Sequence, residues 1–352
     1  MAKVYFHPFE ASVTPQQVQG YTKALLEHLL AEEGAPPLAK RLPLKVHFGE
    51  KGNDTYVRPE NYLGIIEFLK ERGCEPFYME TSVLYAGERY QRQRHIKLAL
   101  EHGFDQLPIQ MADGEEGEDL VEVPIGQKHF ASCFLGRGVV ESEQMVVLSH
   151  FKGHMLAGFG GALKQLSMGC AARAGKLAMH RGVKPQIKES KCRRCHACEK
   201  RCRFGAITIG PDCSIDHDKC KGCGACYATC PHGAIKTFSF LSPGSLLNIL
   251  FGGRSFREGL VEYAYAAQKG KRHLYISFVM NVTRCCDCET RHMKALVPDI
   301  GVYASWDPVA LDTACYDAVA KAGHKFAGRH QLDYAQKLGL GTQQYELVKC
   351  GE

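Results

Sequence analysis

Two stretches of the sequence repeat one another and decide how the chain is organised. Residues 192–207 read CRRCHACEKRCRFGAI, and residues 220–235 read CKGCGACYATCPHGAI. The pattern Cys-x2-Cys-x2-Cys-x3-Cys is therefore present twice. Three thiolates spaced by two residues can wrap three irons of one cubane cluster, and the fourth cysteine then reaches the cubane of the other repeat. This spacing predicts two [4Fe-4S] clusters.

Each cluster is expected to take three cysteines from one repeat and one from the other. The expected ligands of the first cluster are Cys192, Cys195, Cys198 and Cys230, and those of the second are Cys220, Cys223, Cys226 and Cys202. Structural zinc sites are the alternative, but they use paired cysteines at longer separations. Residues 190–237 resemble the bacterial two-cluster ferredoxin and depart from it at Arg203, where the first repeat would usually carry proline.

The segments on either side of the repeat alternate between helix and strand signals, which favours an α/β layered domain with a mostly parallel sheet. We interpret residues 186–238 as a ferredoxin-like α+β module inserted between two parts of that domain, residues 1–185 and 239–352. Two independent domains flanking a linker module are the alternative. Helices are predicted over 15–33, 59–72, 86–102, 257–269 and 308–322, and strands over 42–48, 76–79, 144–148, 273–279 and 300–304.

The composition and net charge of the chain limit its expected location in the cell and its expected binding partners. The chain has 352 residues, 17 of them cysteine, and a formal charge of +6. We expect a cytoplasmic protein, because the first residues lack a secretory signal and no apolar stretch reaches the length of a membrane span. Two clusters with their thiolates would bring about −2 each, so the net charge gives little reason to expect nucleic acid or membrane binding.

Basic side chains surround the first cysteine quartet. They are Lys188, Lys191, Arg193, Arg194, Lys200, Arg201 and Arg203. One interpretation is a docking face for an acidic electron carrier or another redox partner protein, because such encounters are small and steered by charge. The other interpretation is local compensation of the cluster charge.

A second candidate site follows the predicted strand at 144–148. His150 and His154 come directly after this strand, and a glycine-rich stretch then leads to Lys164 and later to His180. Ligands of open α/β sheets bind where strands end. We therefore predict that His150, His154 and Lys164 are catalytic residues acting on a small-molecule substrate. The alternative is that each histidine is a satisfied structural residue.

A third group of cysteines follows the predicted strand at 273–279. Cys285, Cys286 and Cys288 fall within four residues. A metal or a third iron–sulfur site, a redox dithiol, and ordinary packing are the three interpretations. The remaining cysteines have no partner spacing and are expected to be ordinary thiols: Cys74, Cys133, Cys170, Cys213, Cys315 and Cys350.

Taken together, these stretches resemble a family of bacterial and archaeal iron–sulfur-centre proteins known as domain of unknown function 362. The resemblance rests on residues 47–53, 85–95, 149–154, 158–165, 281–288 and 305–312, together with both quartets. It implies an α/β domain carrying an inserted two-cluster ferredoxin module, and it implies no substrate.

Two functions of different classes follow. The first is an iron–sulfur oxidoreductase that passes electrons from two clusters to a second site built from His150, His154 and Cys285 to Cys288. The alternative is a non-catalytic electron-transfer or cluster-handling protein that serves a partner enzyme. An anion or nucleotide binder using residues 158–164 ranks last, because the loop matches no nucleotide fingerprint.

Overall fold

The computed structural model describes residues 1–10, 12–85, 87–180, 185–202, 204–220, 226, 229–236 and 253–350. Its centre is an eight-stranded sheet in the order β16-β1-β15-β14-β7-β2-β3-β4. Neighbouring strands in this sheet are parallel except where β15 lies antiparallel to β1 and β14. The prediction of a mostly parallel sheet is confirmed.

The eight strands of this sheet have the following bounds: β1 (Ala2–Pro8), β2 (Arg41–Lys45), β3 (Glu75–Glu80), β4 (Ile109–Met111), β7 (Val146–His150), β14 (Leu274–Val279), β15 (Gly301–Ser305) and β16 (Tyr345–Lys349).

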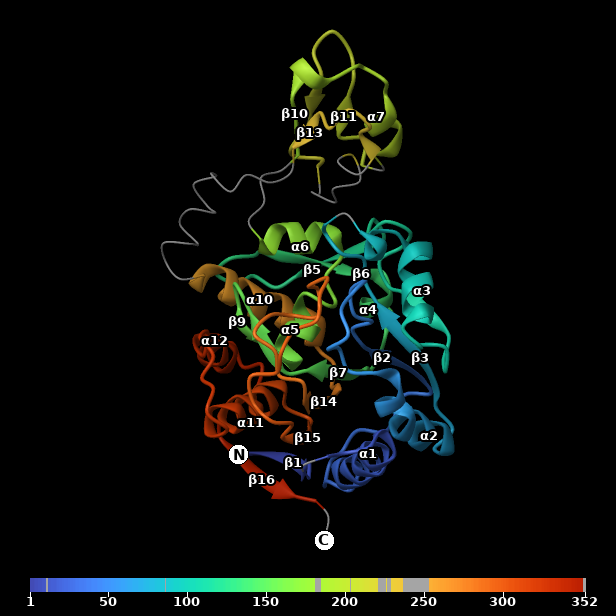
Figure 1. The fold of residues 1–352 in the computed structure, drawn as a ribbon. Helices are drawn as coiled ribbons and strands as arrows, with labels where there is room; N and C mark the ends of the chain where they lie inside the picture. Colours follow the sequence, from blue (N-terminus) through green and yellow to red (C-terminus); the bar gives the residue numbers. More distant parts are fainter. Residues whose placement is uncertain are drawn as a thin grey trace.

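The central strands are buried on both faces. In β14, Leu274, Ile276 and Phe278 pack into the hydrophobic cluster on one face. Tyr275 and Val279 pack into the cluster on the other face. Helices α1 and α2 contribute to the first cluster, and helices α5, α10 and α11 contribute to the second. The sheet is therefore the middle layer of three (Figure 1).

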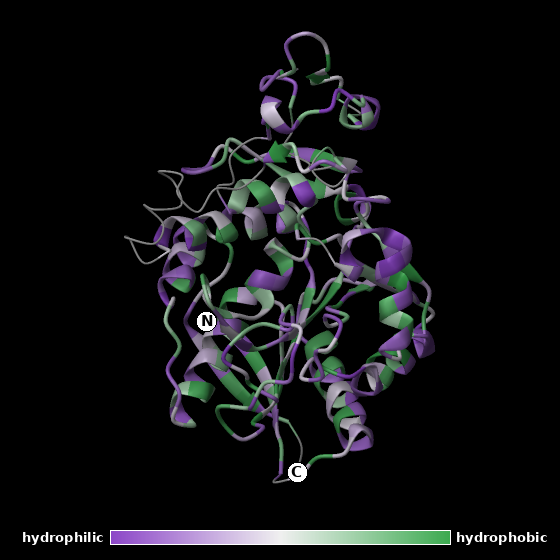
Figure 2. Ribbon diagram, turned by 45° about the horizontal axis from the view of Figure 1, so that its top comes forward, coloured by the Kyte–Doolittle hydropathy of each residue, from purple (hydrophilic) through white to green (hydrophobic). Residues whose placement is uncertain are grey.

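Most of the predicted helices are present, and their caps explain where they begin. Helix α1 (Pro15–Leu30) begins at Thr14, whose side chain accepts from the Gln17 N–H, and α11 (Pro308–Lys321) begins at Asp307, which accepts from the Val309 and Ala310 N–H groups. Helices α2 (Leu63–Glu71), preceded by the 3-10 turn η1 (Pro59–Tyr62), and α10 (Arg254–Gln268) are also present. In Figure 2 the helices carry both hydrophobic and hydrophilic colours, as one buried and one exposed face require.

One predicted helix begins later than expected. The helix predicted over 86–102 is α3 (Arg92–Glu101), and residues 88–90 form the 3-10 turn η2 (Glu88–Tyr90) instead. The physical reason is that Arg89 and Tyr90 turn inward and are buried, which a continuous helix on the surface would not allow.

Shorter elements complete the α/β part. They are the hairpins β5 (Leu120–Pro124) with β6 (Ser132–Gly136) and β8 (Lys152–His154) with β9 (Gly158–Gly160), and the helices α4 (Arg137–Glu141), α5 (Ala162–Ser167), α6 (Arg173–Met179) and α12 (His330–Lys337). In the part of the chain that the structure describes, every helix falls short of the length and apolarity that a bilayer crossing demands.

Residues 185–236 form a small unit at one end of the molecule, beyond α6 (Figure 1). We call this unit the cysteine module. Its first and last strands, β10 (Gln186–Ile187) and β13 (Ile235–Lys236), pair antiparallel, and so do β11 (Ile207–Thr208) and β12 (Ser214–Ile215). Between them lie the 3-10 turn η3 (Glu189–Lys191) and helix α7 (Ala197–Arg201). The flanking chain on both sides of the module contributes strands to the same large sheet.

Candidate functional site

The carboxyl ends of four parallel strands converge on one cavity. His47 follows β2, Glu80 ends β3, His150 ends β7, and the cysteine segment 285–288 follows β14. Because parallel strands end at the same edge of a sheet, residues far apart in sequence meet here. The cavity measures about 240 Å³, and its chemically active lining residues are His47, Glu80, Arg89, His150, Lys152, His154, Lys164, Lys176, His180, Cys286 and Cys288.

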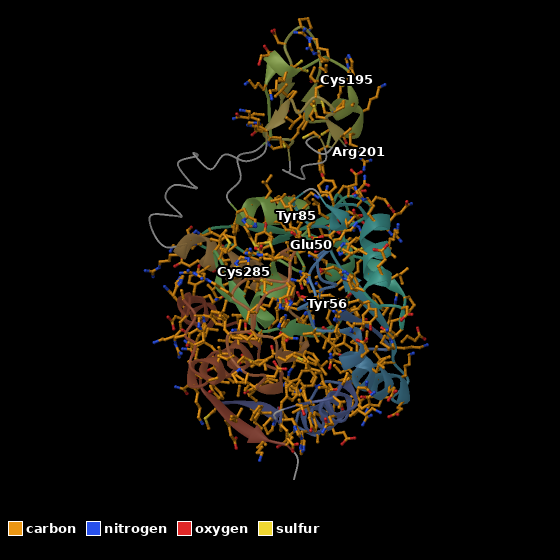
Figure 3. The ribbon with its side chains drawn as sticks, in the orientation of Figure 1. Glu50, Tyr56, Tyr85, Cys195, Arg201 and Cys285 are labelled. Atoms are coloured by element: carbon orange, nitrogen blue, oxygen red, sulfur yellow. The ribbon has the colours of Figure 1, made fainter. Side chains whose placement is uncertain are left out.

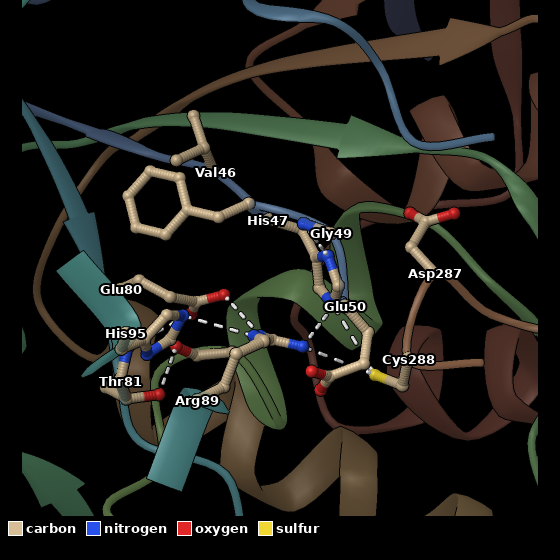
Figure 4. A network of polar contacts seen from close by, with 12 residues as sticks. Val46, His47, Gly49, Glu50, Glu80, Thr81, Arg89, His95, Asp287 and Cys288 are labelled. Atoms are coloured by element: carbon tan, nitrogen blue, oxygen red, sulfur yellow. Dashed lines mark hydrogen bonds and ion pairs between the residues drawn. The ribbon is translucent and has the colours of Figure 1, made fainter. Parts of the chain in front are cut away.

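Asp287 fixes the cysteine segment from its middle. Its carboxylate is fully buried and accepts from His150 Nδ1 at 3.0 Å and from Lys152 Nζ at 2.6 Å. Burial alone would raise the pKa of Asp287, but His150 and Lys152 hold it well below its usual range. Figure 4 shows the Asp287 and Cys288 side chains pointing in different directions. The buried ion pairs therefore leave the neighbouring cysteines facing the cavity.

Cys288 lies against nitrogen atoms of two side chains. The Gly49 N–H donates to His47 Nδ1 at 3.0 Å, and His47 Nε2 lies 3.0 Å from Arg89 Nη1. That Nε2 atom is 3.4 Å from Cys288 Sγ, and Arg89 Nη1 donates to the same sulfur at 3.7 Å (Figure 4). The adjacent Cys286 side chain, His47 and Arg89 together hold the pKa of Cys288 well below its ordinary value, although burial opposes them. The geometry favours a thiolate at Cys288.

Arg89 is held in place by a buried network. Its Nη2 donates to Glu80 Oε2 at 3.0 Å, and its Nε donates to His95 Nε2 at 3.1 Å. Lys45 Nζ binds the other Glu80 oxygen at 2.7 Å. Burial raises the pKa of Glu80, but Lys45 and Arg89 outweigh it and lower that pKa to about 2. Because a buried carboxylate needs this compensation, Arg89 cannot swing freely away from Cys288.

The predicted catalytic residues His150, His154 and Lys164 all line the cavity, together with His180. His150 has both ring nitrogens engaged, by Asp287 and by the Met280 carbonyl at 2.7 Å. His154 accepts the Ala157 N–H at Nδ1, and burial lowers its pKa well below the usual value. Within the described ranges, the Lys164 ammonium has no ion-pair or hydrogen-bond partner, so it is available to a ligand.

The three cysteines of the predicted third site are divided between two environments. Cys286 and Cys288 line the cavity, whereas Cys285 is partly exposed and does not. Among the described residues, no three histidine, cysteine or acidic side chains are close enough to hold one metal ion. A third metal or cluster here stays a prediction, and the guanidinium of Arg89 beside Cys288 is an unfavourable neighbour for a cation.

Sequence reasoning missed Lys45, His47, Glu80 and Arg89 as site residues. The position of His47 and Glu80 near the carboxyl ends of two strands is the signal that could have found them. Arg89 has no such signal, because it lies inside the stretch predicted to be helical.

The cysteines of the first predicted cluster share one pocket. Cys192, Cys195, Cys198 and Cys230 line it together with Ile187, Ile209 and Ile235. Four thiolates that each bind a different iron are the ligand set of a cubane cluster, and a cluster at these four cysteines stays a prediction. Of the second predicted set, Cys202 and Cys226 belong to the hydrophobic cluster that also holds Cys198 and Cys230. Cys220 is partly buried, and Cys223 and Arg203 lie outside the described residues.

Both repeats place the same backbone donor on their fourth cysteine. The Ala206 N–H lies 3.4 Å from Cys202 Sγ, and the Ala234 N–H lies 3.3 Å from Cys230 Sγ. Such N–H groups stabilise a charged sulfur. In addition, Arg194 and His196 have φ of 48° and 57°, and the second repeat carries glycine at the equivalent positions, 222 and 224.

The cysteine module contacts the α/β part beside the turn that carries Arg89. Arg201, one residue before Cys202, forms an ion pair with Glu116 at 2.7 Å, and Gln91 donates to the same Glu116 side chain at 3.1 Å. Figure 3 shows Arg201 at this junction, with Cys195 above it and Tyr85 and Glu50 below it in the view. Two of the basic residues predicted as a docking face therefore have partners within the chain, since Arg194 donates to the carbonyls of Gly210 and Pro211.

Comparison with known proteins gives a family but no established reaction. The model of the family described as Domain of unknown function (DUF362) matches residues 43–317. No curated protein matches the chain. Among solved structures, a Thermotoga maritima protein from a structural genomics consortium aligns at 11% identity over 93% of this chain and 60% of its own, with a TM-score of 0.39. The lactate racemase apoprotein of Thermoanaerobacterium thermosaccharolyticum aligns at 13% identity over 80% and 51%, also with a TM-score of 0.39. The chain thus spans just over half of these proteins.

Proposed function

This chain belongs to the family described as Domain of unknown function (DUF362). We propose that it is an iron–sulfur oxidoreductase. The cysteine module binds two [4Fe-4S] clusters, and the cavity at the carboxyl ends of β2, β3, β7 and β14 is where a small substrate is reduced or oxidised. The first cluster belongs to Cys192, Cys195, Cys198 and Cys230, and the second to Cys220, Cys223, Cys226 and Cys202.

One observation carries the proposal. Cys230 comes from the second repeat, yet it lines the same pocket as the three leading cysteines of the first repeat. The exchange of the fourth ligand between repeats is the feature that the ferredoxin spacing requires. Structural zinc sites instead use paired cysteines at longer separations than those of this repeat.

The side chains of the module would serve bound clusters in two ways. Bound clusters supply one-electron transfer. The N–H groups of Ala206 and Ala234 would donate to the thiolates of Cys202 and Cys230, which favours the more negatively charged state. Ile207, Ile209 and Ile235 are buried between the cysteines and exclude water from them.

The cavity favours an enzyme over a pure electron carrier. It contains a sulfur that faces nitrogen atoms of His47 and Arg89, and it contains Lys164, whose ammonium has no partner among the described residues. A protein that only passes electrons to a partner does not need such a cavity. Under the carrier alternative, replacement of Cys288 or Lys164 would leave every redox activity of the protein unchanged.

Iron and sulfide analysis of protein isolated without oxygen tests the cluster proposal. We expect about eight irons and eight sulfides per chain. A Cys198→Ser variant should lose about half of both, since one cluster loses a ligand. The matched control is Cys213→Ser, because Cys213 lies in the same module, 3.8 Å from Cys192 between the sulfur atoms, but outside both quartets. Wild-type protein with zinc or no metal would refute the proposal.

A further inference from the structure

Cys286 and Cys288 form a thiol pair whose two members differ in character. The Cys288 N–H donates to Cys286 Sγ at 3.3 Å, so the two residues are in contact through the backbone of one and the sulfur of the other. His47 Nε2 and Arg89 Nη1 face Cys288. Both sulfurs line the cavity, and Asp287 between them is locked in the opposite direction by His150 and Lys152. The arrangement matches an attacking thiolate with a resolving thiol beside it.

We propose that Cys288 and Cys286 carry out thiol–disulfide exchange on a small disulfide that bears a carboxylate. Cys288 is the nucleophile, Cys286 resolves the mixed disulfide, and Lys164 binds the carboxylate. His47 and Arg89 are positioning residues that present the Cys288 sulfur to the cavity.

The charge around the cavity selects the substrate class. Four cationic side chains line it: Arg89, Lys152, Lys164 and Lys176. Arg89 is matched by Glu80 and Lys152 by Asp287. Lys176 donates to the Thr81 hydroxyl and the Ala171 carbonyl, both neutral, and Lys164 has no partner within the described part of the chain. Lys164 is therefore the cation of this set that an anionic group of a ligand can offset.

The size of the cavity limits the substrate. Ligand pockets for drug-sized molecules measure roughly 300–1,000 Å³. The cavity measures about 240 Å³, below that range. This volume favours a disulfide with two or three carbons on each side of the sulfurs over a peptide disulfide.

The exchange proceeds in two steps, and atoms and electrons balance in each. In the first, Cys288 thiolate attacks one sulfur of the substrate, its S–S bond breaks, and one thiolate leaves while a Cys288–substrate disulfide forms. In the second, Cys286 loses its proton and attacks Cys288 Sγ, so that a Cys286–Cys288 disulfide forms and the second substrate thiolate leaves with that proton. The substrate disulfide is reduced to two thiols, and the dithiol is oxidised to a disulfide.

Only the reduction of the Cys286–Cys288 disulfide back to two free cysteines rests on the proposed function. It consumes two electrons and one proton, because Cys288 returns as a thiolate and Cys286 as a thiol, and two reduced iron–sulfur clusters supply one electron each. The exchange itself needs no cluster, so the two proposals can fail separately.

A pair of small disulfides of opposite charge tests the inference on the full chain isolated without oxygen. The probes are 3,3′-dithiodipropionate, with two carboxylates, and cystamine, with two amines. In the Cys286→Ser variant we expect a mixed disulfide at Cys288, located by peptide fragmentation. It should form on the order of tenfold faster with dithiodipropionate than with cystamine, because charge complementarity governs encounter. The partly exposed Cys285 on the same peptide is the internal reference, and it should show no such preference.

Two further variants complete the test. Cys288→Ser should give no adduct at Cys286, and Lys164→Met should keep the adduct at Cys288 but lose the preference for the carboxylate probe. An adduct distributed evenly over Cys285, Cys286 and Cys288, or faster reaction with cystamine, overturns the inference. An adduct at Cys288 in protein that contains no iron would support the exchange reaction and refute the cluster proposal. An unreactive Cys288 in protein with about eight irons would refute the exchange reaction and support the clusters.

Discussion

The Nε2 atom of His47 lies 3.4 Å from the Sγ atom of Cys288, although 241 positions separate the two residues. The sheet creates this contact, because β2 leads into His47 and β14 leads towards Cys288, and both strands end at the same edge. The buried Glu80–Arg89 ion pair then supports the contact from the neighbouring strand. The predictions below test each part of this arrangement.

Arg89→Met should strongly destabilise the protein. Arg89 and Glu80 are each about 2% exposed, so the variant leaves a buried carboxylate with Lys45 as its remaining cation. Loss of one partner of a buried ion pair costs about 3–5 kcal/mol. The matched control is Arg94→Met, which removes an exposed pair with Glu88 and should cost less than about 1 kcal/mol. Urea unfolding of both variants measures the difference, and equal costs would contradict the network.

Asp312 should make stability fall as the pH rises. It is buried and accepts from the Ala162 and Leu163 N–H groups at 2.7 and 2.9 Å. Burial outweighs these bonds and raises its pKa to about 7, from 3.8 in the unfolded chain. Between those values the native state holds a proton that the unfolded state has released, so the free energy of unfolding decreases with rising pH and levels off above pH 7.

The Asp312→Asn variant isolates the contribution of the Asp312 carboxyl group to the pH dependence of stability. From pH 5 to pH 8 the wild type should lose about 3 kcal/mol more than Asp312→Asn, which cannot ionise. Denaturant unfolding at both pH values measures the four free energies. Parallel pH profiles for the two proteins would show that Asp312 is ionised in the native state.

Gly160→Ala should disturb Lys164 without removing its charge. A Cβ at residue 160 would lie 2.7 Å from Lys164 Cδ, closer than such atoms approach, and the flexible lysine must shift. Because only the lysine moves, we expect a stability change below about 1 kcal/mol. The preference of Cys288 for dithiodipropionate over cystamine should decrease several-fold. An unchanged preference would mean that the position of Lys164 is unimportant.

Glu116→Gln should weaken the contact between the cysteine module and the turn before α3. The Arg201–Glu116 pair is partly exposed, so the cost in global stability should be about 1 kcal/mol or less. Proteolysis at low protease concentration should nevertheless cut the module junction several-fold faster, because local opening becomes easier. Glu115→Gln, which removes the neighbouring exposed pair with Arg92, is the control. Equal cleavage rates in the two variants would indicate that Glu116 does not hold the module.

Local signals in the sequence predicted the parts of the fold that depend on neighbouring residues. Thr14 and Asp307 cap their helices through contacts two or three residues away. The cysteine repeat predicted two sets of cluster ligands. The cysteines of the first set, Cys192, Cys195, Cys198 and Cys230, line one pocket, and the clusters themselves stay a prediction.

Long-range pairing could not be predicted in the same way. Strands β1 and β16 pair with each other from opposite ends of the chain, and neither was expected. Arg89 was placed on a surface helix because its stretch is charged, whereas in the structure Glu80 and Cys288 draw it inward. The cavity was located at the end of β7 from the sequence, but its lining from β2 and β3 requires the order of strands in the sheet.

A crystal of protein isolated without oxygen, measured at the iron absorption edge, tests the central claim most directly. The account predicts two groups of four irons in the cysteine module, the first bound by Cys192, Cys195, Cys198 and Cys230. An anomalous map with no iron in the module, or with each quartet binding a single metal ion through its own four cysteines, would contradict it.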